Sequence, residues 1–251
     1  NGLRVWANGN VTSAKDEDLE SDAPELLPAY QKSEGFPIGQ YRSQLLSGFY
    51  NTWDEVYGSG VLNAYDDQKL PGNYNIVDFN GDGIIDSYDS APNAYPERPQ
   101  NAYNFTLGAE YKGFSAFVQF YGVNNVTRYM SYSNFPVKTN AVFDQGTYWS
   151  KDNTNADSFL PRWATIMQNT GNYYAWDGSY LRLKNAEIAY TFNENQVKKM
   201  GMKSLKIFLN GNNLWLYTKM PDDRESNLGG NGGGGAYQTV KRINLGVNIV
   251  F

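Results

Sequence analysis

Apolar and polar residues alternate along several stretches of the chain. In AYNFTLGAEYKG, the odd-numbered residues from Tyr103 to Tyr111 are apolar or aromatic, and the residues between them are polar or small. This period of two is the pattern of a β-strand with one apolar face. The stretch FSAFVQFYG alternates in the same way and follows directly after Lys112 and Gly113. The two stretches therefore predict a hairpin with a very short turn.

Four further stretches alternate in the same way: LRVWANGNVTS from residue 3, YLRLKNAEIAYTF from residue 180, LKIFLNGNNLWLYT from residue 205 and RINLGVNIVF from residue 242. In the second of these, the apolar positions change parity at Lys184–Asn185, which predicts a β-bulge. A similar change is expected near Gly211–Asn213. The chain is thus predicted to be all-β, with about six long antiparallel strands.

The predicted connections differ greatly in length. NENQVKKMGMKS is short, and we expect one or two helical turns there, capped by Asn193 and ended by Gly201. Three connections are long, at residues 16–101, 123–178 and 218–239. Short turns on one side and long loops on the other are typical of outer-membrane β-barrels, in which the loops are extracellular and lipid covers the apolar face.

A soluble β-sandwich or barrel with one buried face is the structural alternative. The mean hydropathy of −0.59 suits a soluble protein, but it also suits a barrel fragment whose average is dominated by polar loops. Soluble strands are usually only five or six residues long. Single-chain membrane barrels begin at about eight strands. A barrel would therefore need more strands, either from a missing N-terminal part or from another chain. The chain begins in the middle of a pattern without Met, which fits a piece of a longer protein.

Composition removes several classes of function. A net charge of −5 without a basic stripe argues against a nucleic-acid partner. The absence of Cys and His excludes disulfides, thiolate or imidazole metal sites, and catalytic triads that depend on histidine. A glycosidase that uses only carboxylates remains possible in principle. However, the acidic pairs Asp16–Glu17 and Asp222–Asp223 have the pattern of solvated loop charges, and we expect no enzyme activity.

One motif carries specific chemistry, namely DFNGDGIIDSYD at residues 78–89. Its spacing fits an EF-hand-like loop, with glycine at the sixth position. Hard oxygen ligands at this spacing favour Ca²⁺. The predicted calcium ligands are Asp78, Asn80, Asp82, the Ile84 carbonyl, Asp86 and Asp89. The flanking sequences are rich in Pro and Gly and do not predict the helices of a calcium sensor. We therefore expect a structural clamp on the loop of residues 16–101.

Seven motifs follow one another along the chain, in the order EGFPIGQY, DFNGDGIIDSYD, NAYNFTLGAEYKGFSAFVQFYGV, YWSKDNTNADSFLPRW, YLRLKNAEIAYTF, SLKIFLNGNNLW and RINLGVNIVF. In this order they resemble the C-terminal part of SusC-like TonB-dependent outer-membrane transporters of Bacteroidetes, over essentially the whole chain. The resemblance implies a 22-stranded barrel with an N-terminal plug, of which these would be the last strands. It also implies a SusD-like surface lipoprotein as partner, and import of glycans, oligosaccharides or peptides powered by TonB. The plug and TonB box that would carry this coupling are not in the sequence.

Loop aromatics are candidates for contacting substrate, because amphipathic rings stack well on sugars and peptides. The candidates are Tyr148, Trp149, Trp163, Tyr173, Tyr174 and Trp176. For each of them, loop packing, an interfacial position or contact with the lipoprotein is the favoured alternative. Nutrient import is thus the main functional hypothesis. A secreted, calcium-stabilised β-domain that binds glycans is the second.

Overall fold

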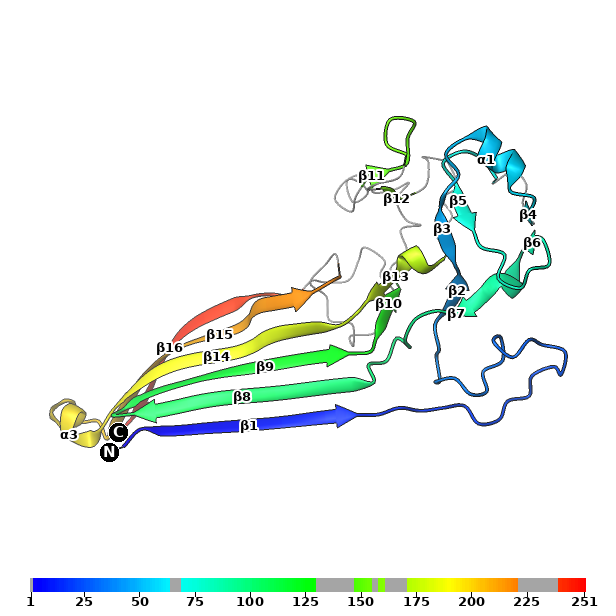
Figure 1. The fold of residues 1–251 in the computed structure, drawn as a ribbon. Coiled ribbons are helices and arrows are strands. Elements are labelled where there is room, and N and C mark those ends of the chain that lie inside the picture. The colour runs from blue at the N-terminus through cyan, green and yellow to red at the C-terminus, as the bar shows by residue number, and fades with distance from the viewer. Residues whose placement is uncertain (1, 64–68, 130–146, 155–157, 161–170, 221–238) are drawn as a thin grey trace.

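A computed structural model describes residues 2–63, 69–129, 147–154, 158–160, 171–220 and 239–251. Its main feature is a six-stranded antiparallel sheet in the order β1-β8-β9-β14-β15-β16 (Figure 1). The strands are β1 (Arg4–Ser13), β8 (Asn101–Tyr111), β9 (Phe114–Asn124), β14 (Tyr180–Phe192), β15 (Ser204–Thr218) and β16 (Arg242–Val250). The prediction of an all-β chain with six long strands is confirmed. No helix among the described residues is long and apolar enough to cross a membrane.

The short connections lie together at one end of the sheet, where both chain termini also lie (Figure 1). Lys112 and Gly113 join β8 to β9 with φ angles of 47° and 89°, and two positive values are those of a tight hairpin turn. Between β14 and β15 lie α3 (Glu194–Val197) and the 3-10 helix η5 (Lys198–Met200). Asn193 caps α3, and Gly201 ends η5 in the left-handed region, as predicted.

The predicted bulge at Lys184–Asn185 is confirmed, but the second change of parity, expected near Gly211–Asn213, is not present. Leu183 pairs with Trp215 and Asn185 pairs with Asn212, so Lys184 opposes two residues of β15. One of these two residues is Asn213, whose φ of 53° lies in the left-handed region. The apolar positions of β14 therefore change from odd to even numbers at the bulge, whereas Leu209 and Trp215 of β15 keep the same parity and lie on the same face.

Four strand glycines lie directly opposite aromatic residues of the neighbouring strand. The pairs are Trp6 with Gly108, Phe105 with Gly9, Tyr103 with Gly122 and Phe208 with Gly246. A Cβ atom added at Gly108 would lie 2.3 Å from the Trp6 ring, and one at Gly246 would lie 2.2 Å from the Phe208 ring. Each ring thus fills the space that the glycine of the neighbouring strand leaves free. This packing fixes the register of the two strands.

The long connections build a second body beyond the other end of the sheet (Figure 1). It contains five short strand pairs: β2 (Arg42–Gln44) with β7 (Ser90–Pro92), β3 (Leu46–Phe49) with β5 (Tyr74–Ile76), β4 (Leu62–Asn63) with β6 (Ile84–Ile85), β10 (Thr127–Tyr129) with β13 (Ala175–Asp177), and β11 (Thr147–Tyr148) with β12 (Ser158–Leu160). The helices in the described part of this body are α1 (Trp53–Gly58) and the 3-10 helices η2 (Ser87–Asp89) and η4 (Asn172–Tyr174). Sequence periodicity did not predict these elements, because two to four residues are too few to show a period.

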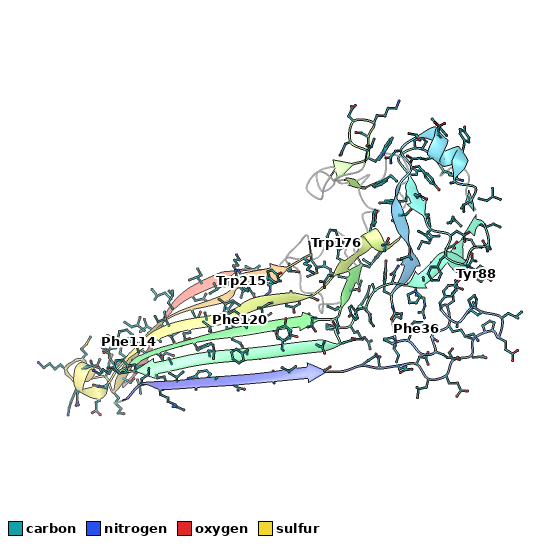
Figure 2. All side chains as sticks on the ribbon, viewed as in Figure 1. Phe36, Tyr88, Phe114, Phe120, Trp176 and Trp215 are labelled. Carbon is teal, nitrogen blue, oxygen red and sulfur yellow. The ribbon has the colours of Figure 1, made fainter. Side chains whose placement is uncertain are left out.

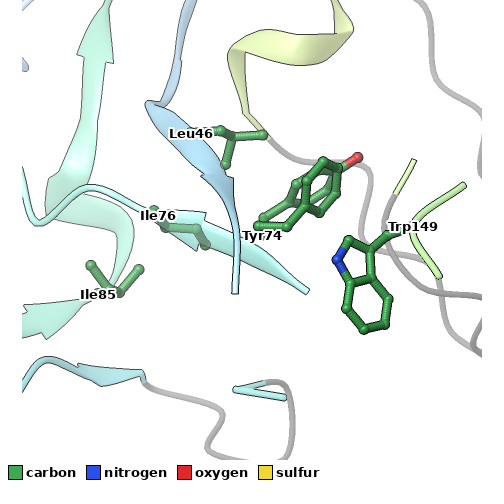
Figure 3. Close-up of a cluster of buried hydrophobic side chains, with 6 residues drawn as sticks. Leu46, Tyr74, Ile76, Ile85 and Trp149 are labelled. Atoms are coloured by element: carbon green, nitrogen blue, oxygen red, sulfur yellow. The ribbon is translucent and has the colours of Figure 1, made fainter. Parts of the chain in front are cut away.

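A buried hydrophobic cluster holds this body together (Figure 3). We call it the loop core; its members are Leu46, Phe49, Tyr74, Ile76, Ile85 and Trp149. It joins two connections that are far apart in sequence, since Trp149 comes from the segment between β9 and β14. The Trp149 indole nitrogen donates to Asn51 Oδ1 at 3.0 Å, and the Leu46 backbone N–H donates to Asn172 Oδ1 at 3.0 Å.

We predict that Gly108→Ala destabilises the sheet by about 1–3 kcal/mol, the usual cost of overpacking. The new methyl group would meet the Trp6 ring, which must then leave its place on β8. Denaturant unfolding of the full-length protein in detergent would measure the loss. Gly2→Ala is the control, because nothing lies within 4 Å of its added carbon. Equal unfolding midpoints for the two variants would contradict the proposed role of the ring.

Truncation of Trp149 tests the loop core. Trp149→Ala removes a ring that is only 7% exposed, and such large-to-small changes cost about 3–5 kcal/mol. We expect faster proteolysis of residues 16–101, with the six long strands left intact. Trp53→Ala is the matched control, because Trp53 is 50% exposed. If both variants were cut at the wild-type rate, Trp149 would not stabilise this body.

Candidate functional site

The six-stranded sheet has an apolar face that nothing covers among the described residues. Register places Leu107, Val118 and Ala186 in one row across three strands, and Ile188, Leu209 and Leu245 in another. Several large side chains on this face are solvent-exposed, among them Leu107 at 40% and Leu245 at 75%. An uncovered apolar surface of this extent marks contact with a membrane or with another protein.

Aromatic rings border this apolar face at both ends of the sheet. At the turn end, the Tyr190 ring lies 4.5 Å from the Phe114 ring and 4.6 Å from the Phe192 ring, measured between centroids. Toward the other end, Trp215 and Tyr217 stack at 6.4 Å. Figure 2 shows Phe114 and Trp215 well separated along the strands. Two aromatic borders around an apolar band are typical of strands that cross a lipid bilayer.

The opposite face carries a continuous polar row across all six strands, together with the rings of Trp6, Phe117 and Phe208. Register aligns the members of this polar row as Asn8, Thr106, Gln119, Asn185, Asn212 and Arg242. Asn212 donates to Asn185, and Asn185 donates to Gln119. Gln119 in turn donates to Asn104 Oδ1 at 3.2 Å. Each of these hydrogen bonds uses one donor and one acceptor of an amide, which leaves further polar capacity facing away from the sheet.

Ion pairs neutralise both carboxylates of the six strands. Lys206 Nζ lies 2.8 Å from Glu187 Oε1, and Arg4 lies 3.6 Å from Glu110 Oε2. The strands carry five basic and only two acidic residues, although the chain as a whole is acidic: Arg4, Arg182, Lys184, Lys206 and Arg242 against Glu110 and Glu187. The sheet is therefore positive while the connections carry the excess of negative charge.

The predicted calcium loop is closed by hydrogen bonds from its own backbone. Asp78 accepts from the N–H groups of Gly81 and Gly83 at 2.8 Å each, and both glycines have positive φ. Asp89 is fully buried and accepts from the N–H groups of Phe79 at 2.8 Å and Asp86 at 2.7 Å. The first and last carboxylates of the motif thus fold the loop onto itself.

The carboxylates of the motif are not gathered around one point as closely as the motif suggests. No group of three or more acidic side chains in the described part of the chain is placed to hold a metal ion. Asp82 and Asp86 each accept an N–H two residues further on, from Ile84 and Tyr88. The residues flanking the loop form the short strands β5 and β7 rather than helices, as expected for a clamp.

The acidic loop affects the ionisation of a neighbouring tyrosine. Tyr30 donates its hydroxyl hydrogen to the Tyr88 carbonyl at 2.6 Å, and its ring meets Phe79 edge-on at 4.9 Å. Burial, followed by the negative charges of Asp89, Asp82 and Asp86, raises the pKa of Tyr30 above its usual value.

Three of the six aromatic candidates pack inside the loops. Trp149 belongs to the loop core, and Tyr173 packs against it, 5.7 Å from Tyr74 between ring centroids. Trp176 packs against a second cluster, formed by Val123, Val126, Tyr180 and Met220. The side chains of Tyr148 and Tyr174, and the whole of Trp163, lie outside the described residues. The polar row was not predicted from the sequence. A signal for it was available, because amide side chains recur at the polar positions of successive strands.

Two curated proteins from Formosa agariphila resemble the chain in sequence. TonB-dependent receptor P3 is 27% identical over 231 residues, covering 87% of this chain. TonB-dependent receptor P26 is 29% identical over 229 residues, covering 81% of it. The chain spans only 22% of the length of each relative. No family model matches the chain.

The fold matches solved structures of the RagAB peptide importer. In its open-open state, the match has a TM-score of 0.68 at 17% identity and covers 99% of this chain and 27% of that one. A second structure, of the RagAB peptide transporter, gives 0.69 at 18% identity, with 98% and 27% covered. The chain therefore has partial homology to TonB-dependent receptors, a family of transporters rather than enzymes, and its six-stranded antiparallel sheet matches part of their barrel.

Proposed function

We propose that the chain forms part of the wall of an outer-membrane transport barrel, with the apolar face toward lipid and the polar face toward the channel. The observation that carries this proposal is the uncovered apolar band with aromatic rings at both ends. A secreted domain would have to bury that face against a second layer, and the described residues contain none.

The open edges of the sheet support the same proposal. In the described sheet, β1 pairs only with β8 and β16 pairs only with β15. Unpaired backbone groups are not tolerated in lipid, so further strands must continue the sheet on both sides. The remaining barrel and plug of a longer protein, or of another chain, would supply them.

The long connections would then be extracellular and would meet a SusD-like surface lipoprotein. They lie at the end of the sheet opposite the tight turns, which in such barrels is the outer side (Figure 1). Import of peptides or oligosaccharides would be driven by TonB through the plug. The match to a peptide importer supports the fold of this wall and leaves the choice of substrate open.

A matched pair of arginine substitutions tests the orientation of the sheet. Leu107→Arg places a charge on the apolar face, where lipid should make it cost about 2–4 kcal/mol. Thr106→Arg places the same charge one residue away, on the polar face. We expect Leu107→Arg to reduce the amount of folded protein in the outer-membrane fraction severalfold, and Thr106→Arg to leave it near the wild-type amount.

Equal effects of the two arginines would contradict the membrane orientation, as would recovery of the full-length protein in the aqueous phase. The second result would favour the secreted glycan-binding domain instead. Transport itself is tested by uptake of labelled peptides and oligosaccharides, which should stop when TonB is depleted.

We further propose that Ca²⁺ binds the loop of residues 78–89 and clamps the 16–101 connection. Asp78, Asn80, Asp82, Asp86 and Asp89, with the Ile84 carbonyl, would supply its oxygen ligands. The support is the motif spacing and the closed backbone of the loop. A metal that binds only the ordered loop stabilises it by linkage.

Chelation of calcium, or Asp78→Ala, should therefore expose residues 16–101 to protease without unfolding the long strands. Asp54→Ala on α1 is the control, because that carboxylate lies in the same connection but outside the motif. Direct titration with Ca²⁺, followed by calorimetry, should show binding that Asp78→Ala abolishes. An unchanged cleavage rate after chelation would count against the clamp.

A further inference from the structure

An asparagine followed by a glycine lies at an exposed point of the loop of residues 78–89. Asn80 and Gly81 are both solvent-exposed, and Gly81 has a φ of 76°. An Asn–Gly pair is especially prone to deamidation, because glycine has no side chain to hinder attack of its backbone nitrogen on the asparagine side chain. Neither the proposed import function nor the proposed calcium clamp makes use of this reactivity.

In the closed loop, hydrogen bonds occupy the groups that this reaction needs. The nucleophile is the backbone nitrogen of Gly81, whose N–H donates to Asp78 Oδ1 at 2.8 Å. The electrophile is the side-chain amide of Asn80, and Asp82 holds it at both ends. Its Oδ1 accepts from the Asp82 N–H at 3.0 Å, and its Nδ2 donates to Asp82 Oδ2 at 2.8 Å. Cyclisation must break these bonds, so the loop has to open first.

From these contacts we infer that Asn80 and Gly81 form a latent modification site, which the closed loop protects and which deamidates when the loop opens. The Gly81 nitrogen loses its proton to water and bonds to Cγ of Asn80. The bond from Cγ to Nδ2 breaks, and that nitrogen leaves as ammonia. Water then opens the resulting succinimide at either carbonyl, which yields an aspartate or an isoaspartate. The net reaction is hydrolysis of one amide and needs only water.

The product does not fit the closed loop. The new carboxylate lacks the Nδ2 donor that binds Asp82, and it places a second negative charge beside that residue. The loop also holds a neighbouring segment of the chain. Tyr30 donates to the Tyr88 carbonyl at 2.6 Å. Gln31 Nε2 donates to the Ser87 carbonyl at 3.0 Å. Deamidation therefore opens the loop irreversibly and loosens its hold on Tyr30 and Gln31.

Peptide mapping by mass spectrometry tests the protection. The purified full-length protein, in detergent with Ca²⁺, is aged at mildly alkaline pH beside a synthetic peptide of residues 74–90. We expect Asn80 to deamidate about tenfold more slowly in the protein than in the peptide, which corresponds to about 1.4 kcal/mol of opening free energy. The Asn210–Gly211 pair is the internal control, because Gly211 lies in β15 and pairs with both β14 and β16. It should stay intact while the sheet is folded.

Two substitutions release the protected groups separately. Asp78→Ala removes the acceptor of the nucleophilic N–H and should speed deamidation of Asn80 severalfold, towards the rate in the peptide. Asp82→Ala frees the Asn80 side chain and should also speed it, which keeps the test decisive if the first variant does not fold. Asp54→Ala lies in the same connection but outside the loop, and it should keep the wild-type rate. Intact Asn210 in each variant shows that the long strands are folded.

A second matched pair tests the consequence of the modification. Asn80→Asp reproduces the aspartate product, whereas Asn80→Ser removes the amide without adding a charge. We expect residues 16–101 to be cleaved by protease severalfold faster in Asn80→Asp than in Asn80→Ser, because only the first places two carboxylates side by side.

The protection is overturned if Asn80 in the folded wild-type protein deamidates at the rate of the peptide, or if neither Asp78→Ala nor Asp82→Ala reacts faster than wild type. Equal cleavage of the two Asn80 variants would contradict the opening of the loop. The reaction is read from the mass of one peptide and involves neither import nor metal affinity. Its failure is therefore separate from a failure of the arginine test or of the calcium titration.

Discussion

Backbone hydrogen bonds between neighbouring strands are the interaction on which the rest of this structure depends. The six long strands pair along nearly their full length, and the register between them places every side chain on one face or the other. A slip of one residue would exchange the two faces completely. In lipid the constraint is stricter, because a backbone group without a partner costs several kcal/mol there. The tight turn, the helix cap, the bulge and the glycine–aromatic pairs of the sheet all help to maintain this register.

Three local features that support this register could be predicted from the sequence, because each depends on neighbouring residues. The turn at Lys112 and Gly113, the cap at Asn193 and the change of parity at Lys184 are each encoded within a few residues. The glycine–aromatic pairs were not visible, because partners such as Trp6 and Gly108 are brought together only by pairing between distant strands. A glycine in a strand looks like a weakness until its cross-strand neighbour is known.

The candidate site likewise has features that are encoded within a few residues and features that depend on contacts between distant parts of the chain. The closed loop of residues 78–89 could be anticipated from spacing, because its members lie within twelve residues and the hydrogen bonds at Asp78 and Asp89 follow that spacing, while calcium binding stays a prediction. The positions of the loop aromatics could not be predicted, since Trp149 is buried against residues that lie 64 to 103 positions earlier in the chain. Packing of this kind depends on how the long connections fold against one another. The polar row likewise exists only once register is known.

The loop core has a mechanical consequence. It fastens the connection before β8 to the connection before β14, through Trp149 with Asn51 and through Leu46 with Asn172. The β10–β13 pair continues from β9 and β14, so the same loops are anchored to the middle of the sheet (Figure 1). A force applied to the long connections would therefore be transmitted directly to β9 and β14, whose pairing is interrupted at Lys184.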